Sequence, residues 1–270
     1  MIPAGSGHPN DRADPMTPVA GDATDVGRLA AGAPTLVHLD ACSSVCRACP
    51  RLVSWREQVA HTRRAAFAAQ PYWGRPVTGW GPADASIAVV GLAPAAHGGN
   101  RTGRIFTGDR SGDWLFRALH RAGLASQPDS TSADDGQTLR DLRITLPVRC
   151  APPANKPTTD ERDTCAPWLV AEWRFLRPTV RAVVVLGGYG WSAIWPVLRA
   201  AGEAVPRRVP AFGHGVEVVV DGGPTVLGCY HVSQQNTFTG RLTEPMLDAV
   251  FLRARQLTGA PAENGTRPHP

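Results

Sequence analysis

Four cysteines in two widely separated pairs are the side chains whose type and spacing point most directly to chemistry. The pairs lie about a hundred residues apart and consist of Cys46 and Cys49, then Cys150 and Cys165. Four thiolates are the ligand count of a tetrathiolate site, which holds either zinc or an iron–sulfur cluster, and spacing alone does not decide between them. Of the two other cysteines, Cys229 lies in an apolar run and is expected in the core, whereas Cys42 is a spare or substitute ligand.

A glycine-rich stretch at residues 91–109 follows an apolar, β-branched run at 86–90 and precedes helical spacing of apolar residues at 111–123. This order predicts a loop that joins the carboxyl end of a strand to the start of a helix. Ligands bind at such loops in open α/β sheets, because glycines let the backbone approach a ligand and the helix N-terminus faces anions. Phe106 and Asp109 would suit an aromatic, polar ligand held next to phosphate. A flexible loop without a ligand explains the glycines equally well.

Further strands and helices alternate along the chain. We expect strands at 142–148, 181–187, 216–220 and 225–230, and helices at 51–69, 160–176, 191–201 and 244–257. Thr159 is expected to cap the helix that follows it. The alternation predicts an α/β fold in which helices cover both faces of a mainly parallel sheet. Residues 1–35 and 259–270 are rich in Pro, Gly and Ala, and we expect a disordered leader and tail around one domain at 36–258.

Composition limits the classes of function. The net charge of +5 permits a polyanionic partner without requiring one. Lys156 is the only lysine, so a Schiff-base nucleophile would have to be this residue or the terminal amine. Neither a signal peptide nor a membrane-spanning run is visible, so we expect a cytoplasmic protein, in which cysteines indicate metal binding or catalysis before disulfides.

Three stretches together resemble family 5 (type b) uracil-DNA glycosylases. They are residues 91–109, residues 149–158 (R-C-A-P-P-A-N-K-P-T) and residues 231–243 (H-V-S-Q-Q-N-T-F-T-G-R-L-T). The resemblance extends over about residues 40–257 and includes the cysteine pattern. It implies a three-layer α/β/α sandwich, a 4Fe-4S cluster on the four paired cysteines, with zinc as the alternative occupant, and excision of uracil from DNA.

The resemblance also implies roles for individual residues. The catalytic positions would be Asp109, Asn155 and His231, and the substrate contacts would be Gly91, Ala93, Phe106, Asn236 and Arg241. Phe106 would stack on a base flipped out of the duplex. Breaking the N-glycosidic bond leaves a sugar cation and a base anion, so His231 would donate a hydrogen bond to the departing base. Asp109 or Asn155 would position water and offset the charge on the sugar.

The same resemblance bears on substrate range and partners. Leu146 stands where related families have an asparagine that reads the uracil edge, so we expect looser base selection that includes hypoxanthine, xanthine or ethenocytosine. Since the one lysine adjoins a proline, we expect a monofunctional enzyme without strand cleavage. We expect a monomer, associated with the bacterial nucleoid through DNA, in which the loop at 232–243 grips phosphates.

Two other interpretations remain open at this point. A non-catalytic iron–sulfur or zinc nucleic-acid-binding module would keep the cysteines and the basic surface. It would not need Asp109, Asn155 and His231 to meet in one pocket. A zinc-stabilised nucleotide-binding enzyme would use the glycine-rich loop for phosphate, although the sequence G-x-x-x-x-G-K-[ST] is absent.

Overall fold

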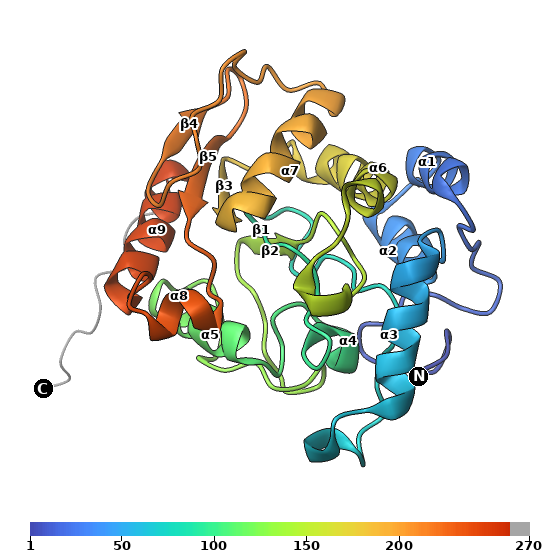
Figure 1. Cartoon of the computed structure of the whole chain (residues 1–270). Coiled ribbons are helices and arrows are strands. Elements are labelled where there is room, and N and C mark those ends of the chain that lie inside the picture. Colours follow the sequence, from blue (N-terminus) through green and yellow to red (C-terminus); the bar gives the residue numbers. More distant parts are fainter. Residues whose placement is uncertain (260–270) are drawn as a thin grey trace, which may run out of the picture.

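A five-stranded sheet with the order β2-β1-β3-β5-β4 lies at the centre of the computed structural model, which describes residues 1–259 (Figure 1). Four neighbouring strands are parallel, and β4 pairs antiparallel with β5 at one edge. The strands are β1 (Ile87–Val90), β2 (Leu142–Thr145), β3 (Ala182–Leu186), β4 (Glu217–Val219) and β5 (Thr225–Cys229). The predicted mainly parallel sheet is confirmed.

Helices cover both faces of this sheet (Figure 1). Along β3, Val184 packs with α5 and α9, whereas Val183 and Val185 pack with α6 and α7 on the opposite face. Successive side chains of a strand point to opposite faces, so a continuous apolar strand fills two cores at once. The covering helices are α5 (Arg110–Arg121), α6 (Thr159–Leu176), α7 (Gly187–Ala200) and α9 (Glu244–Leu257). The three-layer α/β/α architecture is therefore confirmed.

The prediction of a disordered leader at residues 1–35 is wrong. Two helices, α1 (Ala23–Ala31) and α2 (Leu36–Ser44), pack against α6 (Figure 1). Val26 and Ala30 lie four residues apart and bury one face of α1, a spacing that the many alanines and glycines around it concealed. The predicted tail from residue 260 onward lies outside the described residues.

The first residues of the chain lie against the segment at 72–75 and, through Asn10, against the glycine-rich loop. The backbone N–H of Ile2 donates to the Tyr72 carbonyl at 2.9 Å, and Asn10 Nδ2 donates to the Gly103 carbonyl at 3.2 Å. Asp11 and Arg75 form an ion pair at 2.7 Å whose side chains are 2% and 6% exposed. The N-terminal segment thus supports the loop from outside.

Several element ends differ from the sequence-based expectation. The helix expected at 51–69 is α3 (Pro50–Thr62), because Arg63 has a φ of 54° and cannot continue it. Thr158, not Thr159, caps α6, in a reciprocal capping box with Glu161. Short helices complete the chain: η1 (Ala65–Phe67), α4 (Gly99–Thr102), η2 (Pro153–Asn155) and α8 (Gln234–Phe238). Within residues 1–259, every helix is too short or too polar to cross a membrane.

Candidate active site

A cavity of about 330 Å³ opens at the carboxyl ends of the parallel strands. The loops after β1, β2, β3 and β5 all contribute to its wall, which is how residues distant in sequence meet. Five of the predicted site residues line it: Ala93, Phe106, Asp109, Asn155 and His231. The glycine-rich loop therefore borders a cavity of the kind that the sequence predicts for a ligand site.

Phe106 enters the cavity wall in a strained conformation. Its φ of 51° lies in the left-handed region, which a bulky side chain rarely adopts and which is typical of functional sites. Its ring centroid lies 6.2 Å from that of His231. Gly91 lies behind the ring and outside the cavity, since an added Cβ would come within 3.2 Å of Phe106 Cζ and 2.7 Å of Leu146 Cδ2. Gly91 thus leaves room for the aromatic ring and does not itself line the cavity.

Asp109 is the N-cap of α5. Its Oδ1 accepts a hydrogen bond from the Gly112 N–H at 2.9 Å. Its Oδ2 lies so close to Gly98 that an added Cβ there would stand 2.0 Å away. Burial raises the pKa of Asp109 above its usual value, although the hydrogen bonds from Gly112 and Ser111 act in the opposite direction. The carboxylate is therefore fixed at one oxygen and poorly solvated.

His231 and Asn155 present side-chain polar groups that have no partner within residues 1–259. Burial lowers the pKa of His231 to about 4, so its imidazole is neutral at physiological pH. Within residues 1–259, neither the His231 ring nor the Asn155 amide makes a side-chain hydrogen bond; the His231 carbonyl accepts one from Asn236. Asn155 has a φ of 55°, a conformation that asparagine tolerates better than most residues. Both side chains are free to bind a ligand.

A wider groove of about 660 Å³ adjoins the cavity and shares Ala95, Asp109 and Asn155 with it. Arg64, Arg101 and Arg110 are among its lining residues. Arg101 is held in place, since its Nε donates to the His97 carbonyl at 2.8 Å and its guanidinium lies 4.0 Å from the centroid of the Phe67 ring. The groove therefore leads into the cavity past several positive charges.

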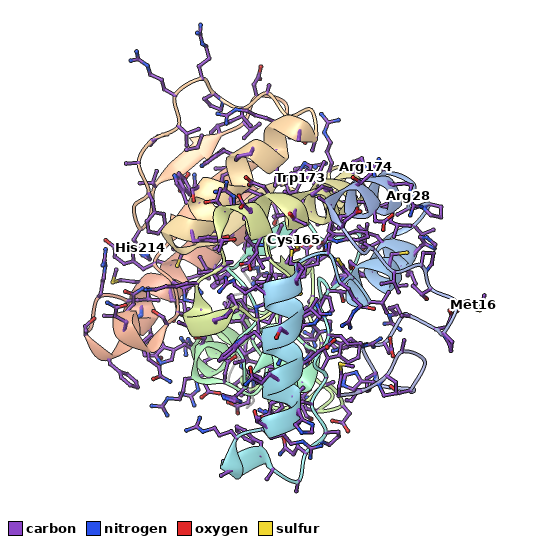
Figure 2. The ribbon with its side chains drawn as sticks, turned by 45° about the vertical axis from the view of Figure 1, so that its right-hand side comes forward. Met16, Arg28, Cys165, Trp173, Arg174 and His214 are labelled. Carbon is purple, nitrogen blue, oxygen red and sulfur yellow. The ribbon has the colours of Figure 1, made fainter. Side chains whose placement is uncertain are left out.

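The four paired cysteines surround one small cavity of about 20 Å³. Cys46 and Cys49 precede α3, Cys150 follows β2, and Cys165 lies on α6, beside the N-terminal end of α3 (Figure 2). Cys229 is fully buried in β5, as predicted for a core residue. Within residues 1–259, no three histidine, cysteine, aspartate or glutamate side chains are grouped closely enough to hold a single metal ion.

Three of the thiols around this cavity, those of Cys46, Cys49 and Cys165, have raised pKa values in the protein alone. Burial, and then the charges of neighbouring thiolates, raise the pKa of Cys49 to about 12; burial likewise raises the pKa values of Cys46 and Cys165. A coordinated metal reverses this effect, because it binds the thiolate form. Four cysteines around one cavity are a donor set whose chemistry fits a metal–thiolate group, and their spacing, too wide for a single ion, favours a multi-atom cluster over zinc.

Comparisons with known proteins agree with this geometry. The family model for the "Uracil DNA glycosylase superfamily" matches residues 78–255. A Mycobacterium bovis protein named "Type-5 uracil-DNA glycosylase" is 57% identical over 258 residues, which is 96% of this chain and 95% of the relative. Proteins of the same name from Mycobacterium leprae (58% over 231 residues, 86% and 99%) and Thermus thermophilus (48% over 216 residues, 80% and 95%) also match. The chain belongs to the uracil DNA glycosylase superfamily.

The family resemblance seen in the sequence is thus confirmed, and the structure sorts the predicted residues. Asn236 and Arg241 do not line the cavity: the Asn236 amide bonds the His231 carbonyl at 2.8 Å, and Arg241 lies over the Tyr230 ring at 4.6 Å. Sequence reasoning missed Tyr189, which lines the cavity and whose buried hydroxyl has no partner in residues 1–259. The glycines just before it, at the end of β3, were a usable signal.

Proposed function

We propose that the protein is a monofunctional uracil-DNA glycosylase, which takes a uracil out of DNA and hydrolyses its N-glycosidic bond. One observation carries the proposal: an aromatic ring, a carboxylate, an amide and a neutral imidazole from three strand-end loops line one cavity. The name shared by the relatives, "Type-5 uracil-DNA glycosylase", supports the choice of uracil.

Phe106 provides the stacking surface in this proposal. A base inside a duplex is out of reach, so it must be flipped into the cavity, at an unstacking cost of a few kcal/mol. The ring of Phe106, fixed by the space that Gly91 leaves, recovers part of that cost by stacking on the flipped base. The His231 ring, 6.2 Å away by centroids, then stands at the edge of the same base.

The reaction produces a negative charge on the base and a positive charge on the sugar. Polar groups in the cavity wall stabilise both. As the bond between the sugar and the base nitrogen breaks, its electron pair stays with the base and a cation develops on the sugar. Neutral His231 donates a hydrogen bond to the developing base anion. The Asp109 carboxylate offsets the sugar cation and, with Asn155, holds the water that adds to the sugar. The water gives up one proton, and the base leaves with a proton from solvent.

The groove next to the cavity provides the path of the DNA strand. Arg64 and Arg110 face it and would pair with phosphates on either side of the flipped nucleotide. Arg241 and the segment at 232–243, which contains α8, would contact the opposite side of the duplex. Binding should therefore weaken steeply as the salt concentration rises.

A 4Fe-4S cluster on Cys46, Cys49, Cys150 and Cys165 completes the proposal, with zinc as the alternative occupant. Four thiols on one enclosed cavity support it. When bound, the group would act as a structural cross-link among three segments. These are the start of α3, the loop after β2 and α6, and the second of them also carries Asn155. Iron, sulfide and zinc analysis of the purified protein separates a cluster from zinc.

We also infer a monomer that acts in the bacterial cytoplasm and associates with the nucleoid through DNA. Hypoxanthine, xanthine and ethenocytosine are proposed as further substrates. The cavity wall is largely apolar or backbone, and Leu146 is 2% exposed and packs behind Phe106, so it cannot read a base edge.

An excision assay tests the proposed function. Duplexes that carry one uracil, hypoxanthine, xanthine or ethenocytosine are incubated with the protein, and half of each sample is then treated with alkali. We expect cleavage at uracil only after alkali, which marks an abasic site. Strand scission without alkali would contradict a monofunctional mechanism. DNA binding without any excision would support the non-catalytic module instead.

A further inference from the structure

Arg56 on α3 places a buried positive charge against the cysteine cavity. Its side chain is 2% exposed and lines that cavity. One terminal nitrogen, Nη1, donates to Cys150 Sγ at 2.8 Å, and the other, Nη2, donates to the Cys46 carbonyl at 3.0 Å. The Nε group has no partner in residues 1–259. The guanidinium thus contacts one of the four cysteines through sulfur and a second through its backbone.

Other buried arginines of the described chain are compensated differently. Arg75, Arg104, Arg143 and Arg149 each pair with a carboxylate. Arg101 has no such partner but borders the open groove, where a phosphate can reach it. Arg56 is enclosed, and within residues 1–259 it forms no ion pair with a carboxylate. A charge that is buried away from water requires a nearby opposite charge, and no carboxylate within residues 1–259 provides one for Arg56.

We propose that Arg56 is the counter-charge of the metal–thiolate group and sets its electrostatic potential through the Cys150 sulfur. Four thiolates with either zinc or a 4Fe-4S cluster keep a net negative charge, which supplies this opposite charge. A cation and a hydrogen bond at a ligand sulfur stabilise the more negative, reduced state of a cluster, and so raise its reduction potential. Arg56 is a positioning residue and takes no part in base excision.

The same residue connects the cysteine cavity to the glycine-rich loop. Asn100 in α4 is fully buried and its Nδ2 donates to the Arg56 carbonyl at 3.2 Å. Asn100 lies in the loop that carries Phe106 and Asp109. Because this bond goes to the backbone of Arg56, it joins the loop to the helix α3 that carries Arg56 and does not depend on the guanidinium. The inference rests on the proposed cluster and is independent of the identity of the excised base.

The test is a spectroelectrochemical titration of the full-length, iron-loaded protein, comparing the wild type with Arg56→Met, Arg56→Lys and Arg47→Gln. At a fixed ambient potential we expect the ratio of reduced to oxidised cluster to fall ~10-fold or more in Arg56→Met, which equals ~59 mV for a one-electron couple. Arg56→Lys keeps the charge and should stay much closer to the wild type. Arg47→Gln is the control, because Arg47 adjoins Cys46 but its side chain is 49% exposed and paired with Glu57.

Each outcome decides between the proposals. An unchanged potential in Arg56→Met, or an equal change in Arg56→Lys and Arg56→Met, overturns the inference, since shape and not charge would then matter. If Arg56→Met does not retain iron, Arg56→Lys should retain it and Arg56→Gln should not; equal loss from both contradicts the proposal. Wild-type protein that holds neither a cluster nor zinc overturns both the cofactor and this inference. A loaded protein that shows the shift but excises no uracil refutes the proposed function alone.

Discussion

One loop contributes to two cavities: the base cavity, lined by Phe106, Asp109, Asn155 and His231, and the cysteine cavity, lined by the four paired cysteines. The two cavities differ in which kind of polar group they leave without a partner. The segment between β2 and α6 gives Cys150 to the enclosed cysteine cavity and Asn155 to the open base cavity. Around the base cavity, Asp109 is poorly solvated, the His231 ring and the Asn155 amide are unpaired in residues 1–259, and the backbone is strained at Phe106. Around the cysteine cavity, the unpaired group is the buried cation Arg56.

The difference is the one expected between a site for a transient ligand and a site for the proposed permanent occupant. Free neutral donors and a strained backbone lower stability, and they are retained where a substrate uses them during turnover. A buried cation next to four thiols is tolerable only if an anionic group stays bound. Mutations at the base cavity should therefore abolish activity at little loss of stability, whereas mutations at the cysteine cavity should unfold the protein.

The largest effect is expected from Cys49→Ser. Losing one ligand should release the bound group and leave the remaining buried thiols and Arg56 without their partner. We expect loss of iron and a fall in Tm of ~10 °C or more, given that ~1 kcal/mol moves the Tm of a chain of this size by ~2–4 °C. Cys42→Ala is the control, because Cys42 is more deeply buried than Cys49 but lies outside the cavity and should leave the iron content unchanged. Similar iron loss in both variants would contradict the proposal that only the cysteines of the cavity hold the bound group.

Asp109→Asn should show the reverse pattern. Removing the carboxylate should lower the rate of uracil excision ~100-fold or more. Because the pKa of Asp109 is raised in the folded protein, its stabilising contribution is complete at low pH and is lost as the pH rises through that pKa. At neutral pH the ionised group therefore opposes folding, and asparagine keeps the helix cap. We expect a Tm at or above that of the wild type by calorimetry; a clear decrease would show that Asp109 is mainly structural.

Gly98→Ala tests how tightly the carboxylate is placed. The added Cβ would overlap Asp109 Oδ2, so the side chain must move by a substantial part of an ångström. We expect kcat to fall ~10- to 100-fold with DNA affinity nearly unchanged. Gly27→Ala, in the middle of α1 with no atom within 4 Å of the new Cβ, is the control and should be neutral or slightly stabilising. Equal activity of both variants would mean that Asp109 need not be fixed.

The pH dependence of kcat should show the smallest effect, as a gradual change with pH. His231 has a pKa of about 4, so its neutral form persists through the physiological range, whereas the ionised form of Asp109 is lost at a pH above its usual carboxyl range. The acid limb of kcat should therefore follow Asp109. A nitrogen NMR titration of His231 should show a neutral ring down to about pH 4. A ring that titrates near its usual pKa would contradict an unprotonated donor.

Local patterns allowed much of this molecule to be predicted from its sequence. The strand at 181–187 and the helix at 244–257 were recognisable because long apolar runs and helical periodicity depend on neighbouring residues alone. The helix α1 was missed because its sequence is rich in alanine and glycine. It is stabilised by packing on α6, which is far away in the sequence. Such contacts leave no local signal.

The candidate site was predictable to a different extent. Phe106, Asp109, Asn155 and His231 were identifiable only as parts of a family pattern, since each alone has an ordinary structural explanation. The functions of Gly91 and Gly98 as space for a ring and a carboxylate depend on distances of closest approach. The burial of Arg56 gave no signal in the sequence either, because the sequence does not distinguish a buried arginine from an exposed one.

Release of free uracil in a single turnover tests whether the cavity of Phe106, Asp109, Asn155 and His231 excises the base. Excess protein, wild type or His231→Ala, is mixed with a duplex that contains one uracil, and the free base is quantified over time. We expect stoichiometric release by the wild type and a rate ~100- to 1,000-fold lower for the variant, with equal DNA binding. Wild-type protein that binds the duplex without releasing uracil, or a variant as fast as the wild type, would contradict it.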